Sequence, residues 1–446
     1  MLYHPNLYDR TQPIGSFWET TVPPLFPTDI TPLSQDTTCD VAIIGGGITG
    51  LNAALYLAKE AGIQAHVLDA GTVAWGASGR NGGFVCVGAT WLTNHQLLQK
   101  FGGEEVRRFA QQQRQGTELV RHIAASEGIE IDAQGTGEIL VAHRPSRWQA
   151  LEEEYDFLTE IAEYPCTLWS QKDLAEHAYH SPEAHGALHI GVGFGLNPLK
   201  YSRGLANAVR QAGLTLSLQS PVEAWEKSGH WHLLQTPGGT LRAKQVILAT
   251  NGYSDEQLVP SLRGTLLPVI SNIITTRPLT AAELAAQGWK TETPLYDTRL
   301  LLFYFRLLKD GRFLLGSRGG TRGDQQERDR QRSWMIRRLG EMFPAWKDVE
   351  VTHYWNGLVC GSTTLTPHVG QFSADPSVFY SLAYHGNGVA TGTWCGRAIA
   401  QILAGRKRVE DLPALLRQPL KRFPLARLRR WYLRSAYAFF GLQDQQ

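Results

Sequence analysis

The sequence has few cysteines and lacks any hydrophobic run long enough to cross a membrane. Its 446 residues include 5 Cys, an odd number, and no two of them have CxxC or metal-site spacing. We therefore expect neither a disulfide framework nor a metal site, and a reducing, cytoplasmic location fits better. No run of about 18 apolar residues occurs, which argues against a transmembrane helix. Where a secretory signal would have an apolar core, the N-terminus has acids and several prolines.

An excess of charge of one sign is also missing. The formal net charge is only +2, so composition does not favour a nucleic-acid partner. The 45 Gly follow no fixed period, and the G-x-S-x-G turn of many hydrolases is absent. With 43% hydrophobic residues, the chain is long enough for two or three domains with a large core.

The clearest pattern that is present is a glycine-rich turn between a strand and a helix. Residues 41–44 (VAII) form a short apolar run, as a buried parallel strand does, and Gly45-x-Gly47-x-x-Gly50 follows directly. Apolar residues then recur at helical spacing, and a second short strand ends at Asp69. In such a unit the glycines let a pyrophosphate approach the helix N-terminus, and the acid binds a ribose hydroxyl. The pattern therefore predicts a dinucleotide site.

Both NAD(P) and FAD use this turn, and three further segments favour FAD. Residues 75–83 (WGASGRNGG) are rich in small residues, which lets backbone lie against a flat ring system. Residues 246–253 (VILATNGY) are a strand that ends in a small-residue turn, and residues 384–389 (YHGNGV) open a second helix. FAD is long and needs several separated segments, so this distribution favours it over NAD(P).

These segments resemble one family. The stretches 40–51 (DVAIIGGGITGL), 76–83, 249–253 (ATNGY) and 355–357 (WNG), with 304–306 (YFR), 310–312 (DGR) and 367–370 (PHVG), resemble the FAD-dependent D-amino-acid oxidase (DAO) superfamily. Within it the chain is most similar to the gamma-glutamylputrescine oxidoreductase-like branch. The resemblance covers nearly the whole chain and is more specific for flavin and fold than for substrate.

The resemblance implies an α/β protein in which a Rossmann-type FAD-binding domain is interleaved with an α+β substrate domain built on an antiparallel sheet. The expected divisions are an N-terminal arm over 1–37, an FAD-binding domain over 38–90, 195–255 and 355–446, and a substrate domain over 91–194 and 256–354.

The resemblance also implies which residues lie along FAD. They are Gly45, Gly47, Ile48, Thr49, Gly50, Asp69, Ala70, Gly76, Ala77, Ser78, Arg80, Asn81, Gly82, Val222, Thr250, Asn251, Gly252, Gly357, Gly386, Asn387, Gly388 and Val389. Sarcosine oxidases attach flavin through a Cys ahead of a Thr-Pro, but Cys360 lies out of register with that position. We therefore expect noncovalent FAD and a buried Cys360 thiol.

The implied chemistry is oxidation of the C–N bond of a small amine or amino acid to an imine. Tyr304, Arg306 and Trp355 are the side chains expected at the substrate. Arg306 lies near the place where glycine and D-amino-acid oxidases bind a carboxylate, although a strand Arg that bonds backbone remains the alternative. The Lys with which sarcosine oxidases bind their substrate is absent after the turn 386–388, so N-methylglycine is disfavoured.

Several alternatives stay open. A D-amino-acid or N-alkyl amino-acid dehydrogenase or oxidase is one, and a flavin-binding subunit that turns over no amine by itself is another. Oxygen, a quinone or another acceptor could take the electrons. The stretch 417–434 holds seven basic residues and no acid, so it forms either a solvated helix face or a peripheral contact with an anionic membrane.

Overall fold

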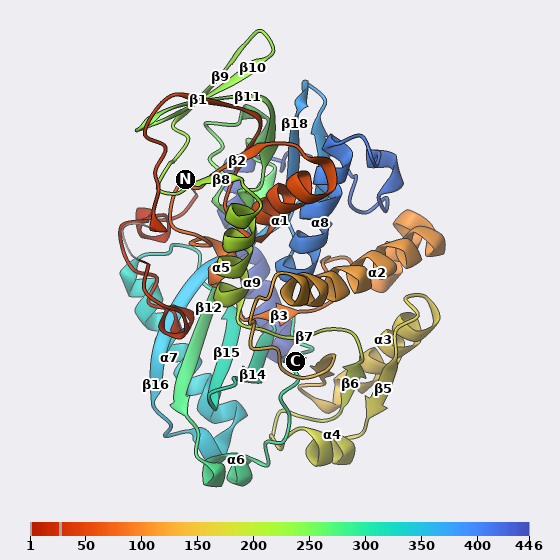
Figure 1. The fold of residues 1–446 in the computed structure, drawn as a ribbon. Helices are drawn as coiled ribbons and strands as arrows, with labels where there is room; N and C mark the ends of the chain where they lie inside the picture. Colours follow the sequence, from red (N-terminus) through yellow and green to blue (C-terminus); the bar gives the residue numbers. More distant parts are fainter. Residues whose placement is uncertain (1, 26–28, 446) are drawn as a thin grey trace.

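The structure is a computed structural model that describes residues 2–25 and 29–445 (Figure 1). Of the predicted arm, residues 1 and 26–28 lie outside the described residues. The described residues form two eight-stranded sheets and a small two-stranded one, β3 (Phe84–Val85) with β7 (Phe194–Gly195). It is the expected α/β class.

The first sheet is built around the strand that precedes the glycine-rich turn. Its path runs β17-β18-β11-β1-β2-β8, and β10 and β9 extend it from β11. The pairs within β18-β11-β1-β2-β8 are parallel, whereas β17–β18 and the β9–β10–β11 hairpins are antiparallel. Its strands are β1 (Thr37–Ile44), β2 (Ala65–Leu68), β8 (Thr215–Ser217), β9 (Ala224–Ser228), β10 (Trp231–Thr236), β11 (Gly239–Leu248), β17 (His368–Phe372) and β18 (Asp375–Leu382).

The second sheet has the order β16-β12-β15-β14-β13-β4-β6-β5. It is antiparallel as expected, except that β13 pairs with β4 in parallel. Its strands are β4 (Glu138–Val141), β5 (Cys166–Trp169), β6 (Ala187–Ile190), β12 (Leu266–Pro278), β13 (Leu295–Asp297), β14 (Phe303–Leu307), β15 (Arg312–Arg318) and β16 (Val351–Ser362). The pairing of β16 with β12 continues to Ser362, so this strand crosses residue 355, where the sequence places a domain boundary.

Nine helices are described, and those that pack on the first sheet come from distant parts of the chain. In Figure 1, α1 lies between α5 and α8 beside this sheet, and it contacts both. The helices are α1 (Ile48–Tyr56), α2 (Asn94–Ser126, interrupted at Gly102), α3 (Trp148–Glu160), α4 (Gln171–His177), α5 (Pro198–Gln211), α6 (Ala281–Gln287), α7 (Gln325–Met342), α8 (Gly388–Leu403) and α9 (Arg429–Gln445).

The N-terminal arm is docked on the protein, as its large apolar residues suggest. Phe17 and Trp18 are buried, and the Trp18 indole donates to the carbonyl of Asn81 at 2.9 Å. The hydroxyl of Tyr3 donates to the carbonyl of Pro268 at the start of β12. The arm thus contacts both the 75–83 loop and the second sheet.

Candidate active site

The turn between β1 and α1 has no room for side chains larger than glycine. A Cβ on Gly50 would lie 1.9 Å from the carbonyl oxygen of Gly45. A Cβ on Gly45, which has φ +113°, would lie 2.8 Å from the carbonyl oxygen of Ala249, and one on Gly47 would lie 2.7 Å from Ser78 Oγ. The glycines therefore let the turn pack closely against β11 and the 75–83 loop.

Two helices begin at this site without a side-chain cap from the residue that precedes them. Gly47 precedes α1 and Asn387 precedes α8, and neither supplies a side-chain hydrogen bond to its helix. The Ile48 N–H at the start of α1 donates to Ser78 Oγ at 3.0 Å, so the N–H groups of Thr49 and Gly50, with those at the start of α8, are available to an anionic or electron-rich ligand. By contrast, the N-termini of α2, α4, α5, α6 and α7 are each capped by a side chain, namely Thr93, Ser170, Asn197, Thr280 and Asp324.

Asp69, at the end of β2, holds the two loops that flank it. Its Oδ2 accepts from the Gly46 N–H at 2.7 Å, and its Oδ1 accepts from the Gly71 N–H at 2.8 Å. Burial raises the pKa of this carboxyl, and the two backbone N–H groups oppose that rise. Each oxygen keeps acceptor capacity for a ribose hydroxyl.

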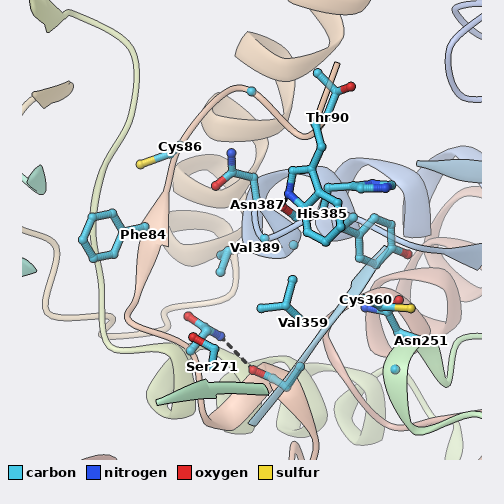
Figure 2. Close-up of a pocket in the computed structure, with 18 of the residues that line it drawn as sticks. Phe84, Cys86, Thr90, Asn251, Ser271, Val359, Cys360, His385, Asn387 and Val389 are labelled. Carbon is cyan, nitrogen blue, oxygen red and sulfur yellow. Dashed lines mark hydrogen bonds between the residues drawn. The ribbon is translucent and has the colours of Figure 1, made fainter. Parts of the chain in front are cut away.

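One cavity of about 1550 Å³ brings the predicted cofactor residues together. All of those predicted to lie along FAD line it except Gly50, whose role is the close packing described above. Cavities for one small ligand are usually about 300–1,000 Å³, so this one has room for a dinucleotide and a substrate. Figure 2 shows Asn251 on one side and Phe84, Cys86, Asn387 and Val389 on the other.

Arg80 and Asn81 line the cavity but use their polar atoms on the backbone. Arg80 Nε donates to the carbonyl of Trp75 at 2.7 Å, and Nη1 to that of Asn356 at 3.2 Å. The Asn81 amide donates to the carbonyls of Ala77 and Ser78 and accepts from the Gly83 N–H. These two side chains therefore fix the shape of the loop along the cavity.

Cys360 also lines the cavity, on β16. Its side chain is buried, and that burial raises the pKa of the thiol well above its ordinary range. A protonated thiol is a poor nucleophile.

Of the three side chains expected at the substrate, one lines the cavity and two do not. Tyr304 lines the cavity, and its hydroxyl lies 2.9 Å from Ser271 Oγ. Arg306 and Trp355 are fully buried behind the cavity wall and do not line it.

Both of these side chains bond to backbone instead. Arg306 Nε donates to the carbonyl of Gly82 at 3.0 Å and Nη2 to that of Leu196, while the Trp355 indole donates to the carbonyl of Arg80 at 2.7 Å. The structure therefore corrects the expected substrate contact of Arg306 and Trp355, because their polar atoms support the loops around the cavity.

The cavity also contains polar residues that the sequence did not single out, notably Arg318, Glu138 and Tyr296. Arg318 is the last residue of β15, directly before Gly319 and Gly320. A charged residue at the end of a strand, directly before two glycines, is a pattern from which Arg318 could have been identified as a candidate site residue. Glu138 begins β4 and gives no comparable signal in the sequence.

Glu138 is a buried acid in the cavity wall. It is 2% exposed, and burial raises the pKa of its carboxyl to about 7, which the Cys86 thiol and the Val87 N–H partly offset. The Val87 N–H lies 3.4 Å from Oε1. The surrounding protein groups therefore offset only part of the cost of a buried negative charge on Glu138.

His385 also lines the cavity, in the turn before α8. Burial lowers the pKa of its imidazole to about 3. Its Nε2 accepts from the Ser362 N–H at 3.2 Å, so the neutral ring carries its proton on Nδ1. The imidazole of His385 is therefore a neutral, buried ring in the cavity wall.

At the surface, the basic C-terminal segment carries exposed aromatic residues. Trp431 and Phe439 on α9 are 60% and 56% exposed, and Leu425 before the helix is 73% exposed. Inside the same segment, Arg429 is buried and pairs with Glu256 at 2.6 Å, which fastens α9 to the protein. Among the described helices, none combines the length and the hydrophobicity that a membrane span requires.

Relatives of known name match over almost the whole chain. The gamma-glutamylputrescine oxidoreductase of Escherichia coli is 29% identical over 437 residues, which is 98% of this chain and 99% of that protein. A probable oxidoreductase, OrdL, of Rhizobium meliloti is 31% identical over 436 residues, 96% of this chain and 97% of the relative.

Solved structures share the fold. Glycine oxidase from Geobacillus kaustophilus superposes with a TM-score of 0.71 at 20% identity, covering 87% of this chain and 99% of that one. L-proline dehydrogenase from P. horikoshii gives 0.68 at 15% identity, covering 84% and 96%. The family model for FAD-dependent oxidoreductases, DAO, matches residues 40–402. Together with the glycine-rich turn, the two helices that begin at the cavity and the cavity itself, these matches show that the chain belongs to the DAO family of FAD-dependent oxidoreductases.

Proposed function

We propose that this protein oxidises the C–N bond of an amine to an imine, with FAD bound noncovalently in the large cavity. The observation that carries the proposal is the continuity of that cavity. The glycine-rich turn lies in the same space as Tyr304 and Ser271, which come from the second sheet. A cofactor held by the first sheet thus faces polar side chains of the second, which supports the division into a cofactor domain and a substrate domain.

The residues present fit FAD. The free N–H groups at the start of α1 suit its pyrophosphate, Asp69 suits the adenosine ribose, and the turn 386–389 suits the ring system. When bound, FAD supplies the acceptor for a hydride and its two electrons. The protonated Cys360 thiol leaves the cofactor without a covalent link.

The protein's own contribution is to bind and orient the amine and to exclude water. A protonated amine has no lone pair to stabilise the cation that forms at carbon, so the amine must react in its neutral form. Burial favours that form, because a low-dielectric wall disfavours an ammonium. The hydroxyl pair of Tyr304 and Ser271, 2.9 Å apart, can donate to or accept from the nitrogen without carrying charge.

The substrate class follows from the relatives only in outline. The Escherichia coli relative is named for gamma-glutamylputrescine, and we propose an amine of that kind for this chain. A D-amino-acid or N-alkyl amino-acid substrate is the second candidate, which the fold shared with glycine oxidase favours.

Anaerobic bleaching of the bound flavin tests the proposal. The FAD-loaded protein is mixed without oxygen with amines, D-amino acids and N-alkyl amino acids, and the flavin absorbance is followed. Reduction by an amine and not by its alcohol analogue is expected. If only alcohols reduce the flavin, C–N oxidation is wrong. If nothing reduces it although FAD is bound, the chain is a flavin-binding partner subunit.

We also propose that α9 touches an anionic membrane, where a quinone could receive the electrons. Exposed Trp431 lies among Arg427, Arg430 and Arg434, and exposed Phe439 follows further along the same helix, an arrangement that suits the interface of an anionic bilayer. Sedimentation with vesicles of phosphatidylglycerol should carry the protein down, and vesicles of phosphatidylcholine should not. The double variant Trp431→Ala, Phe439→Ala should stay in solution. Equal sedimentation of variant and wild type would exclude this contact.

A further inference from the structure

The large cavity continues past the predicted cofactor residues into a region between α2 and α3. We call this region, whose wall residues 92–190 form, the α2–α3 lobe. The two helices are neighbours in Figure 1, and Asn94 of α2 donates to Glu154 Oε2 of α3 at 2.7 Å. Most of the side chains that line the lobe are apolar, among them Leu97, Phe109, Leu140, Phe157, Ile161 and Tyr164. Such a lining suits an aliphatic chain.

The lobe begins beside the residue expected at the substrate. The rings of Tyr304 and Phe84 lie 5.5 Å apart between their centroids. Phe84 begins β3, and Cys86 and Val87 follow it along the cavity wall (Figure 2). The Val87 N–H in turn lies 3.4 Å from Oε1 of Glu138. A ligand whose amine lies near Tyr304 can therefore extend along this segment into the lobe.

Acids without basic partners line the lobe. Residues 92–190 contribute no lysine or arginine to the cavity wall, but they contribute the acids Glu138, Glu153, Glu154, Asp156 and Glu160. Within residues 2–25 and 29–445, no ion pair involves any of these carboxyls. Glu153, Asp156 and Glu160 are exposed on α3, so the lobe reaches the surface at an acidic rim. An acidic rim attracts cations to the opening.

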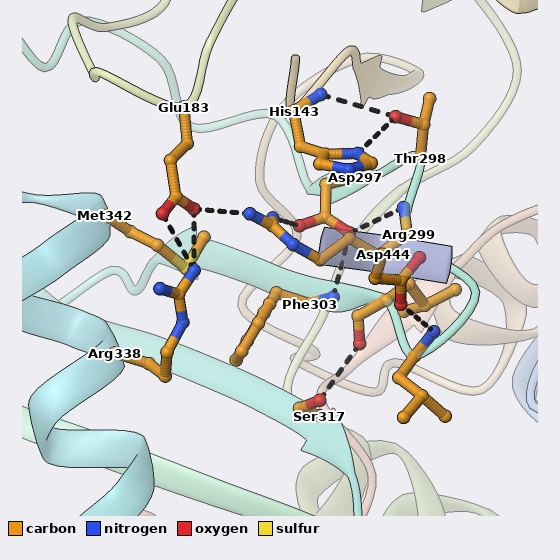
Figure 3. Close-up of polar contacts among 12 residues, drawn as sticks. His143, Glu183, Asp297, Thr298, Arg299, Phe303, Ser317, Arg338, Met342 and Asp444 are labelled. Atoms are coloured by element: carbon orange, nitrogen blue, oxygen red, sulfur yellow. Dashed lines mark hydrogen bonds and ion pairs between the residues drawn. The ribbon is translucent and has the colours of Figure 1, made fainter. Parts of the chain in front are cut away.

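Acids elsewhere against the second sheet have arginine partners. Asp297 on β13 is buried and pairs with Arg299. Figure 3 shows that Arg299 also reaches the partly buried Glu183, which pairs with Arg338 as well. The protein thus neutralises these acids with its own cations, which it does not do in the lobe.

The two inner acids of the lobe, Glu138 and Glu154, have only neutral partners. Glu138 is buried beside the Val87 N–H and the Cys86 thiol, and Glu154 is partly buried and accepts from Asn94. Burial raises the pKa of both carboxyls, and no basic side chain of the described residues lowers either one. A buried carboxylate without a cation is costly. The pair therefore points to a cation that enters from outside the chain.

We propose that the α2–α3 lobe binds a second, positively charged nitrogen of the substrate between Glu138 and Glu154, while the reacting amine lies near Tyr304 and Ser271. This inference rests on the proposed function and narrows it to amines that carry an ammonium group at the far end of an aliphatic chain. The apolar wall suits the chain, and the carboxylates suit the three N–H donors of an ammonium.

Binding to protein whose FAD has been reduced beforehand with light tests the lobe without turnover, because reduced flavin cannot accept another hydride. Putrescine, cadaverine and hexamethylenediamine are titrated by calorimetry without oxygen and above neutral pH. At least one diamine should bind. Glu138→Gln and Glu154→Gln should each weaken that binding about 10- to 150-fold, as expected for the loss of one charge-assisted contact. Glu104→Gln, an exposed change on α2, should bind as wild type does.

Flavin reduction in the oxidised protein tests whether the second nitrogen helps the reaction. At low concentration, the favoured diamine should reduce the flavin about 10- to 150-fold faster than the monoamine of the same length. Both glutamine variants should lose most of this preference. Aminocaproate, whose far end is a carboxylate, should react more slowly than hexylamine.

Folding and FAD affinity provide the controls. Glutamine keeps the shape of glutamate, and at residue 154 it keeps an acceptor for Asn94, so both variants should be at least as stable as wild type and bind FAD equally well. The proposal is overturned if no diamine binds, if the glutamine variants bind diamines as wild type does or lose FAD, or if monoamines reduce the flavin as fast as diamines. Diamine binding that depends on both acids, without any flavin reduction by amines, would refute the proposed function alone.

Discussion

Replacing Glu138 by glutamine should change how the stability of this protein depends on pH. The carboxyl is 2% exposed in the cavity wall, and its pKa is raised from 4.5 to about 7. Burial is the main cause, and Glu154 on α3 adds a like charge. Other titratable groups whose pKa values respond to Glu138 are Cys86, Tyr164, Cys166 and Tyr296.

The sign follows from proton binding. Between about pH 4.5 and 7 the folded protein holds a proton on Glu138 that the unfolded chain has released, so stability falls as pH rises through this window. The full loss, reached above pH 7, is about 3 kcal/mol, because each unit of pKa shift corresponds to about 1.4 kcal/mol. Glutamine has a similar shape and does not ionise, so Glu138→Gln should escape this loss.

Thermal unfolding of the FAD-loaded wild type and variant at about pH 5 and about pH 8 measures the effect. From the lower to the higher pH, the free energy of unfolding of the variant should rise relative to that of wild type by roughly 2–3 kcal/mol. This corresponds to a rise of several degrees in the Tm of the variant relative to wild type. The Tm of Glu104→Gln, an exposed change on α2, should depend on pH as that of wild type does, so that the two curves are parallel. If the Glu138→Gln curve also runs parallel, Glu138 does not hold a proton in the folded protein at neutral pH.

Three other predictions concern the cofactor and the loops. Acid precipitation should release all the flavin into the supernatant, because the Cys360 thiol stays protonated; yellow colour in the pellet would contradict this. Asp69→Ala should weaken FAD binding about 10- to 150-fold by losing a charge-assisted hydrogen bond, and an unchanged dissociation constant would place Asp69 away from the ribose. Arg306→Met should lower stability by about 2–4 kcal/mol, as two backbone carbonyls lose a buried charged donor. The variant should keep the wild-type preference between acidic and neutral amines. A loss of activity confined to acidic substrates would indicate that Arg306 contacts the substrate.

The parts of this protein that depend on local geometry can be predicted from its residues alone. The turn 45–50 needs glycines because neighbouring backbone leaves no room for a Cβ, and such a requirement is written directly into the residue types. The strand before the turn, the helix after it and α8 could be predicted for the same reason, since apolar spacing and helix starts are local features. FAD could be inferred because its length requires several such segments.

Which polar side chains line the cavity depends on the tertiary structure. Arg306 and Arg318 look alike in the sequence, as arginines on neighbouring strands of one hairpin. The cross-strand register turns Arg318 toward the cavity beside Ser271, while Arg306 is buried on the carbonyls of Gly82 and Leu196. Glu138 lies in the cavity wall because the fold brings β4 beside Cys86, the residue after β3, which is 52 residues earlier in the chain. Side-chain direction and long-range contacts of this kind depend on how the two sheets pack, which no local pattern encodes.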